Sequence, residues 1–387
     1  MNKKELELYI HIPFCVRKCS YCDFLSAPAT EQTREAYMAA LFAEIGGRAK
    51  DYSDRTVTSI FIGGGTPSLL SGEQIGQLMD RIREQFAMAQ DAEITMEVNP
   101  GTASAEKLRN FYTAGINRLS IGMQSAQAEE LKNLGRIHDF EGFCQVYREA
   151  VEAGFTNINV DIMSGLPGQT LASYRDTLEK VLHLEPMPQH ISAYSLIVEE
   201  GTPFAAMAER GELPLPEEET ERAMYEETIE VLAKYGFHRY EISNYARDGY
   251  ECRHNVGYWI RRDYLGFGIG AASLIDNVRF QNEKSLGAYL AHPLESREEE
   301  QTLTVQDRME ETMFLGLRLT RGVSCMDFAE QYGRTVEEVY GEVIARNVAD
   351  GLLTVTERKE NQKKDRFLAL TKRGLDLSNY VMAQFLF

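Results

Sequence analysis

Three cysteines near the start of the chain have the types and spacing that most clearly indicate chemistry. Cys15, Cys19 and Cys22 form a C-x3-C-x2-C pattern. A structural zinc site uses four protein ligands, and the chain has no second C-x2-C pair, although a catalytic zinc takes three ligands. Three local thiolates with one open metal position suit an iron–sulfur cube better, because one iron then stays free to chelate a small molecule. Disulfides are disfavoured because three neighbours cannot all pair; the remaining alternative is three ordinary buried cysteines on a loop.

The element that must position these cysteines is a predicted β-strand directly before them. Apolar and polar residues alternate along it, with Leu6, Leu8, Ile10 and Ile12 on one face and Glu7, Tyr9 and His11 on the other. Period-two alternation is typical of a strand, and Pro13 ends it because proline cannot continue a ladder. The cysteines are therefore predicted on the loop at the carboxyl end of this strand.

Further strands and helices alternate along the next part of the chain. Strands are predicted over residues 6–12, 57–62, 93–98, 118–124, 157–163 and 190–196, with helices over residues 31–50, 74–86, 103–114, 143–153 and 171–184. Such alternation predicts an α/β fold with a parallel sheet and helical crossovers. A barrel and an open doubly wound sheet are the two candidate architectures.

Polar residues and glycines lie at or just beyond the carboxyl ends of successive predicted strands. They are Tyr9, the run Gly63-Gly64-Gly65-Thr66, Glu97, Gln124 and Asp161. In a barrel, this face is where chemistry takes place. The recurrence in five repeats therefore indicates one shared site of the barrel type.

Each of these features also has a plainer interpretation. The glycine run lets a ligand approach the backbone and its amide donors, but it also fits a tight turn, and it lacks the Lys-Ser/Thr ending of a phosphate loop. Glu97 and Asp161 suit acid–base chemistry, or they are structural carboxylates. Arg136 suits a ligand contact or a surface ion pair.

A second cluster of chemically capable residues lies in the segment 252–259, which contains the only tryptophan of the chain. Cys252, His254, Tyr258 and Trp259 offer an imidazole, a thiolate and aromatic walls, as a haem pocket requires. The alternative is a packed segment that closes the barrel, with His254 as a hydrogen-bonded core histidine. The glycines of residues 266–270 indicate another close backbone approach, expected beside the same site.

The last part of the chain is predicted to be a separate small domain. A charged stretch over residues 296–301 is expected to separate it, and three helices, a hairpin and a final helix over residues 372–385 follow, in a winged-helix-like α+β arrangement. This arrangement raises DNA binding as a hypothesis. However, residues 304–387 hold 12 Lys and Arg against 13 Asp and Glu, and the whole chain has a net charge of −18. Both values argue against a nucleic-acid surface and favour packing or partner docking.

The cysteine pattern, followed by an aromatic residue, resembles the signature of the radical S-adenosylmethionine (SAM) superfamily. The flanking sequences YIHIPFC (residues 9–15) and CDF (residues 22–24) are similar to the oxygen-independent coproporphyrinogen III oxidase family, and within it to the HemW-type haem chaperone branch. This resemblance implies an incomplete (β/α)6-type radical SAM barrel and a [4Fe-4S] cluster bound by the three cysteines. It also implies SAM contacts from Tyr9, Gly63, Gly64, Gly65, Thr66, Glu97, Gln124, Arg136 and Asp161.

The same resemblance extends to the second cluster, because His254-Asn255-x-x-Tyr258-Trp259 is similar to a motif of the HemW-type branch. It implies a haem site that includes His254, Cys252, Tyr258 and Trp259. Two departures from the oxidases themselves put decarboxylation in doubt. Phe24 stands where those enzymes have a fourth cysteine, and the first strand begins only a few residues after Met1.

These expectations define a functional hypothesis. The protein is expected to be a cytoplasmic haem chaperone that binds haem and passes it to acceptor proteins; the alternative is a radical SAM enzyme that acts on a tetrapyrrole. An electron donor is required if SAM is cleaved, and an acceptor in a membrane is compatible with a chain that has no apolar run of about 18 residues. The predicted domains are residues 1–215 (partial barrel), 216–303 (extension with the HNxxYW motif) and 304–387.

Overall fold

The first half of the chain builds a parallel sheet whose strands are neighbours in chain order. The computed structural model describes residues 3–360 and 363–386. The parallel strands are β1 (Lys4–Ile12), β2 (Arg55–Gly64), β3 (Ala87–Val98), β4 (Arg118–Gln124), β5 (Ile158–Ser164) and β6 (His190–Ser195). The predicted alternation of strands and helices and the parallel pairing are thereby confirmed.

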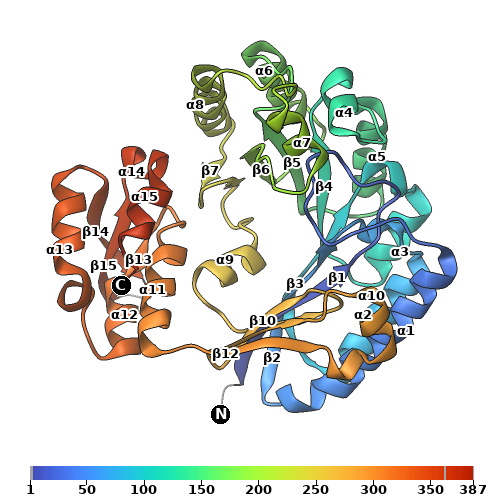
Figure 1. Cartoon of the computed structure of the whole chain (residues 1–387), viewed down its shortest axis with the longest axis horizontal. Coiled ribbons are helices and arrows are strands. Elements are labelled where there is room, and N and C mark those ends of the chain that lie inside the picture. The colour runs from blue at the N-terminus through green and yellow to red at the C-terminus, as the bar shows by residue number, and fades with distance from the viewer. Residues whose placement is uncertain (1–2, 361–362, 387) are drawn as a thin grey trace.

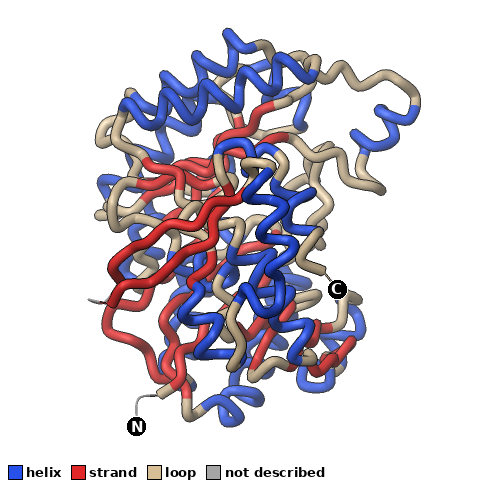
Figure 2. Tube along the Cα trace, turned by 90° about the vertical axis from the view of Figure 1, so that its left-hand side faces the viewer, coloured by secondary structure: helices blue, strands red, loops and turns tan. Residues whose placement is uncertain are grey.

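The crossover helices lie on the outer side of this curved sheet, which forms the inner layer (Figures 1 and 2). They are α1 (Glu31–Arg48), α2 (Gly72–Gln85), α3 (Ala105–Thr113), α4 (Ala128–Leu134), α5 (Phe140–Glu152) and α6 (Leu171–Leu182). Side-chain caps fix several starts; Ser71, for example, forms a capping box with Gln74 before α2. The short helix α4 was not predicted from the sequence.

The two faces of the strands have different partners, as the alternation in β1 predicts. Leu6, Leu8, Ile10 and Ile12 are fully buried in the main apolar core. The residues between them, such as Glu7 and Tyr9, point to the opposite face. Glu7 is in register with Ser59 of β2, and Ser59 is in register with Glu93 of β3, so the three share this face. Ser59 and Glu93 form polar contacts there. The inner face of the sheet is therefore polar, and this face forms the site.

Further strands extend both edges and bring the sheet to twelve strands in the order β12-β11-β10-β9-β1-β2-β3-β4-β5-β6-β8-β7. Of these added strands, β9 pairs with β1 in parallel, and the others pair antiparallel. The added elements are α7 (Pro203–Glu209), α8 (Glu218–Lys234), β7 (His238–Arg239), β8 (Asn244–Ala246), α9 (Arg253–Trp259), β9 (Tyr264–Phe267), β10 (Ala272–Ile275), β11 (Val278–Asn282), α10 (Leu286–Ala291) and β12 (Arg297–Thr302). Six parallel βα units with different edge strands at the two ends make an incomplete barrel, as predicted.

The charged stretch over residues 296–301 has a different role from the expected one. It is not a separator, because it belongs mostly to β12, which pairs with β11 at the sheet edge. All six residues of β12 are exposed. An exposed edge strand tolerates charged side chains, and charges there prevent further strand pairing.

The remainder of the chain forms a small α+β unit with its own apolar core. Its elements are α11 (Val305–Gly316), β13 (Val323–Ser324), α12 (Cys325–Tyr332), α13 (Val336–Ala349), β14 (Leu353–Glu360), β15 (Lys363–Leu370), α14 (Lys372–Asp376) and α15 (Ser378–Ala383). The strands of this unit make a sheet in the order β13-β15-β14. The predicted final helix is divided at Leu377 into α14 and α15. Within the described residues, no helix is both long and apolar enough to cross a membrane.

Candidate functional site

The cysteine loop begins where β1 ends and is closed at its base by backbone hydrogen bonds. The Cys15 amide donates to the Ala27 carbonyl at 3.2 Å, and the Ala27 amide donates to the Pro13 carbonyl at 3.0 Å. Within the loop, the Cys22 amide donates to the Cys19 carbonyl at 3.3 Å. The sequence between residues 15 and 27 is therefore held as one excursion over the carboxyl edge of the sheet.

All three cysteines of the loop are free thiols and line one cavity of about 560 Å³. Burial raises the pKa of Cys15 and of Cys22. No three His, Cys, Asp or Glu side chains of the described chain converge closely enough for a single metal ion. A four-iron cube does not require convergence on one point, since each thiolate binds a different iron. The three free thiols on one cavity therefore fit such a cluster better than they fit zinc.

The glycine run packs tightly against the cysteine loop. The amides of Gly65 and Thr66 donate to the carbonyls of Ile12 and Phe14 at 2.8 and 2.7 Å, and the Gly64 amide donates to Glu97 Oε2 at 3.0 Å. A Cβ on Gly65 would lie 2.6 Å from the Phe14 carbonyl oxygen. These three amides already have partners in the protein, so the run does not offer them to a ligand as the sequence suggested.

Glu97 lies beside this run and lines the cysteine cavity. Burial and, to a smaller extent, the nearby Asp161 together raise the pKa of its carboxyl to about 8, although the hydrogen bond from the Gly64 amide opposes both. A carboxyl with this pKa is mostly neutral at pH 7 and ionises when a cation approaches. Glu97 is therefore suited to bind an ammonium group.

Asp161 and Gln124 lie on neighbouring strands in the same cavity. Asn159 Nδ2 donates to Asp161 Oδ1 at 2.7 Å, and Ser120 Oγ donates to both carboxylate oxygens at 3.3 and 3.4 Å. Burial nevertheless raises the pKa of Asp161. Gln124 has a φ of 69° and accepts a hydrogen bond from Tyr194 Oη at 3.0 Å. Both side chains are held in fixed orientations before any ligand arrives.

Arg136 connects the sheet to the cysteine loop. Its Nη2 donates to the Gly122 carbonyl at 2.7 Å, and its Nη1 lies 3.9 Å from Cys19 Sγ. Its Nε is buried without a hydrogen-bond partner. This environment differs from the surface ion pair considered above, because the guanidinium faces a thiol and the cavity.

Tyr9 lines a second cavity of about 370 Å³, which shares Gly64, Glu97 and Phe24 with the first. The Tyr9 hydroxyl lies 3.0 Å from His11 Nδ1, and His11 Nε2 lies 2.9 Å from the Leu25 carbonyl. Since a carbonyl only accepts, Nε2 carries the proton and Nδ1 accepts from Tyr9. Of the predicted SAM residues, Gly64, Gly65, Thr66, Glu97, Gln124, Arg136 and Asp161 line the cysteine cavity, whereas Gly63 lies beside Glu97.

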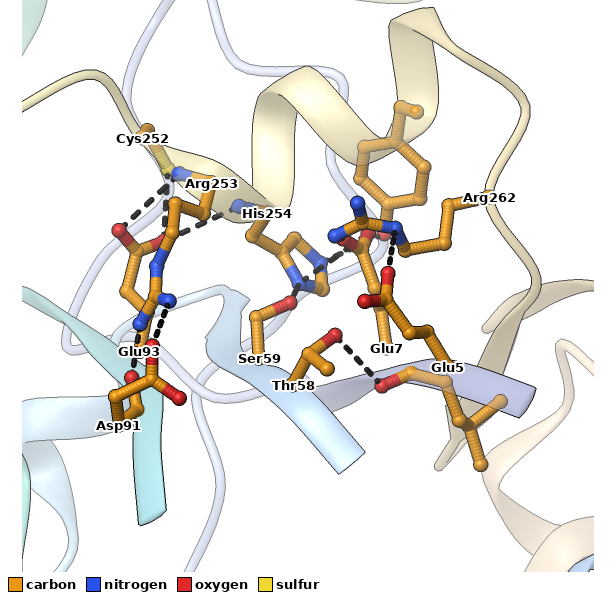
Figure 3. Close-up of polar contacts among 12 residues, drawn as sticks. Glu5, Glu7, Thr58, Ser59, Asp91, Glu93, Cys252, Arg253, His254 and Arg262 are labelled. Carbon is orange, nitrogen blue, oxygen red and sulfur yellow. Dashed lines mark hydrogen bonds and ion pairs between the residues drawn. The ribbon is translucent and has the colours of Figure 1, made fainter. Parts of the chain in front are cut away.

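The second predicted cluster forms α9, which lies across the inner face of the sheet (Figure 3). Glu93 accepts from the Cys252 thiol at 3.5 Å and from the amides of Arg253 and His254 at 3.1 Å each. A carboxylate at the amino end of a helix satisfies its free amides and its dipole. Glu93 thereby fixes α9 to β3.

His254 is buried and has partners on both ring nitrogens. Nδ1 lies 2.9 Å from Ser59 Oγ and Nε2 lies 3.1 Å from the Tyr258 hydroxyl. Burial lowers the pKa of His254 to about 3, and the fully buried Cys252 has its pKa raised to about 12. In this conformation, both residues are part of the core, as the plainer interpretation holds. Iron ligation by either one requires α9 to move, and it stays a prediction.

The remaining aromatic residues of the motif face different surroundings. Tyr258 lines the second cavity with Tyr9. Trp259 packs under the guanidinium of Arg318, whose Cζ lies 4.3 Å from the ring centroid. Glu311 pairs with Arg261 at 2.8 Å and so joins α11 to the end of α9. The C-terminal unit therefore contacts the motif helix directly.

Several cavity residues were not identified from the sequence. Arg118, Ser120, Asn159, Ser192 and Tyr194 line the cysteine cavity beside the predicted residues, and so does Asn255 of the predicted motif. The first five occupy inward positions of β4, β5 and β6, two residues apart along each strand. The period-two pattern that was read in the first strand could have found them in the later strands.

Comparisons with known proteins agree with this geometry. A family model described as the radical SAM superfamily matches residues 9–181, and one described as the HemN C-terminal domain matches residues 303–377. The haem chaperone HemW of Bacillus subtilis is 38% identical over 385 residues, 98% of each chain, and that of Escherichia coli is 42% identical over 269 residues, 69% of each chain.

A solved structure extends the similarity to the whole fold. The radical SAM enzyme coproporphyrinogen III oxidase (HemN) from Escherichia coli superposes with a TM-score of 0.84 at 28% identity, and the alignment covers 100% of this chain and 91% of that chain. The relatives named HemW, in contrast, are 36 to 42% identical in sequence to this chain. This chain belongs to the HemW haem chaperone family of the radical SAM superfamily.

Proposed function

We propose that this protein is a haem chaperone that binds haem and transfers it to acceptor proteins, and that it carries a SAM-chelated [4Fe-4S] cluster. The observation that carries the proposal is similarity to relatives named haem chaperone over 98% of both chains. The cysteine loop supports the same assignment, because its fourth position is Phe24 and not a further cysteine. Phe24 is 58% exposed and lines both cavities.

The cavity supports the two resident cofactors. Cys15, Cys19 and Cys22 would hold the cluster and leave one iron for SAM, since a cube has four irons and the loop has three thiols. Glu97 would receive the ammonium group of SAM, because its carboxyl is held beside the glycine run. Asp161 and Gln124 would orient polar groups of the nucleoside. When reduced, such a cluster supplies a low-potential electron to the sulfonium.

The haem site is proposed around α9, with His254, Cys252, Tyr258 and Trp259. The aromatic wall of the second cavity supports a flat apolar ligand, because Tyr258, Tyr264 and Phe24 line it. The burial of His254 and Cys252 means that a haem iron reaches them only after α9 separates from Ser59 and Glu93. Haem binding should therefore alter the packing between α9 and the sheet.

A tetrapyrrole-modifying radical SAM enzyme is the second candidate function. It is favoured by the fold similarity to HemN from Escherichia coli, named as a coproporphyrinogen III oxidase. The two functions are separated by anaerobic incubation of the reconstituted protein with reductant, SAM and coproporphyrinogen III. The chaperone proposal predicts no protoporphyrinogen above the level of a cluster-free control. Sustained turnover would support the enzyme in its place.

The proposed partners are haem, haem-accepting proteins and, if SAM is cleaved, an electron donor. A cytoplasmic location is proposed, and a membrane-bound acceptor is compatible with it. Nucleic acid is not proposed as a partner, because the net charge of −18 repels a polyanion. A filter-binding titration that gave tight nucleic-acid binding at physiological salt would oppose this assignment.

A further inference from the structure

The cysteine cavity reaches much deeper than the residues proposed for the cluster and SAM. Arg118 is the first residue of β4 and Gln124 is the last, and both line this cavity. Six residues of strand correspond to about 20 Å. The deep end is lined by Arg118, Asn159, Ser192, Ser243, Asn244 and Asn255. This polar end, called here the Arg118 chamber, has no role in the function proposed above.

Arg118 is charged, buried and poorly partnered. It is 2% exposed, its Nη1 donates to Thr95 Oγ1 at 3.5 Å, and its Nε has no hydrogen-bond partner. Among the described residues, it forms no ion pair within 4.0 Å. A buried guanidinium without a hydrogen-bonded anion is costly. A side chain of this kind on a cavity wall indicates an anionic guest.

The neighbouring carboxylates do not satisfy this guanidinium. Glu93 accepts from the Cys252 thiol and from two amides of α9, and Asp161 accepts from Asn159 and Ser120. Their charges act on Arg118 from beyond ion-pair distance, but their oxygens bond other donors. The N–H groups of Arg118 therefore still require an acceptor.

A second residue of the chamber wall, Asn244, also has an unsatisfied polar atom. Asn244 Oδ1 is buried without a partner, while its Nδ2 donates to Glu241 Oε1 at 2.6 Å. Asn255, which comes from α9, adds a further amide to the wall. An orphaned donor and an orphaned acceptor together suit a guest that brings both kinds of atom, such as a hydrated carboxylate.

We propose that the Arg118 chamber binds a carboxylate, with the Arg118 guanidinium as its principal donor. The chamber is the deep end of the cysteine cavity, whose whole volume of about 560 Å³ is in the range of small-molecule sites. Two sources supply this group: the propionate limb of a tetrapyrrole, or a free small carboxylic acid. The first source rests on the proposed function; the binding of a carboxylate does not.

The test uses sodium propionate as the probe and the anaerobically reconstituted full-length protein. A ligand that binds the folded state raises the melting temperature in a saturable way. Propionate should raise it by several degrees, whereas the uncharged isostere propionamide should not. The saturable rise should be lost in Arg118→Gln and partly kept in Arg118→Lys. A rise that grows linearly with salt, or persists in Arg118→Gln, is a general salt effect and overturns the proposal.

The wild-type comparison of propionate with propionamide remains decisive if a variant fails to fold. Competition then separates the two sources of the carboxylate. If a tetrapyrrole limb occupies the chamber, haem should abolish the rise in melting temperature caused by propionate, whereas haem dimethyl ester, which has no free carboxylate, should leave that rise unchanged. A response that survives saturating haem assigns the chamber to a free acid. Haem binding without any propionate response overturns the chamber and leaves the chaperone proposal intact. A propionate response without haem binding supports the chamber and overturns the chaperone proposal.

Discussion

Glu97 should release a proton when SAM binds, and the amount can be worked out from its environment. Its pKa is about 8 because burial and Asp161 disfavour the charged form. At pH 7, about nine-tenths of the free protein then carries a neutral Glu97. An ammonium at Glu97 returns the pKa toward its ordinary value of 4.5. Binding at pH 7 should therefore release about 0.9 proton from this group.

The affinity for SAM should depend on pH because Glu97 must ionise. Only the ionised carboxylate pairs with an ammonium, and its population rises about tenfold between pH 6 and pH 7. SAM affinity should rise by about the same factor over this interval, where the amino group of SAM, with a pKa of about 7.7–8.0, remains protonated. Above about pH 8 the affinity should fall again, because Glu97 is then ionised but the amino group of SAM loses its proton.

Calorimetry in two buffers of different ionisation enthalpy measures the released protons. The comparison is between the wild-type protein and Glu97→Gln, because protons that other groups release or take up when SAM binds are then common to both. The wild type should release about 0.9 proton more at pH 7, and only the wild type should show the pH-dependent affinity. Equal proton release in both proteins would refute the role of Glu97.

Three further predictions follow from the described contacts. Replacing the three loop cysteines by serine should abolish the absorbance of the reconstituted cluster, while Cys144→Ser, on α5, should retain it; cluster retention in the triple variant would contradict the assignment. Gly64→Val should weaken SAM binding at least tenfold because a Cβ there collides with the His11 ring at a φ of 107°, whereas Gly168→Ala, with a φ of 78° and open space, should not; calorimetry decides this. Glu7→Gln should melt a few degrees above the parent at pH 9 and close to it at pH 5. Burial raises the pKa of Glu7 to about 8, so folding loses stability as pH rises from about 4.5 through 8; equal melting temperatures at pH 9 would contradict this.

Local patterns were sufficient to predict the elements that position the site. The alternation in β1 placed the cysteine loop at a strand end, and β4 spans the predicted residues 118–124. Short elements were missed because they contain too few residues to show a period. The helix α4 has seven residues, and the exposed strand β12 has charged side chains without alternation.

The contacts that fill the cavity could not be predicted in the same way, because they join distant parts of the chain. Nothing near Gly64 in sequence indicates that Glu97 accepts its amide. Likewise, the pairing of His254 with Ser59 spans 195 residues. Whether His254 was a ligand or a core histidine depended on that partner, and only the fold supplies it.

Optical titration of haem into the anaerobically reconstituted protein tests the central claim most directly. The chaperone account predicts a saturable change in the haem spectrum, with cluster absorbance retained throughout. The change should be altered in His254→Ala or in Cys252→Ser if α9 supplies the iron ligand. A haem spectrum that stays that of free haem at every protein concentration would contradict the account.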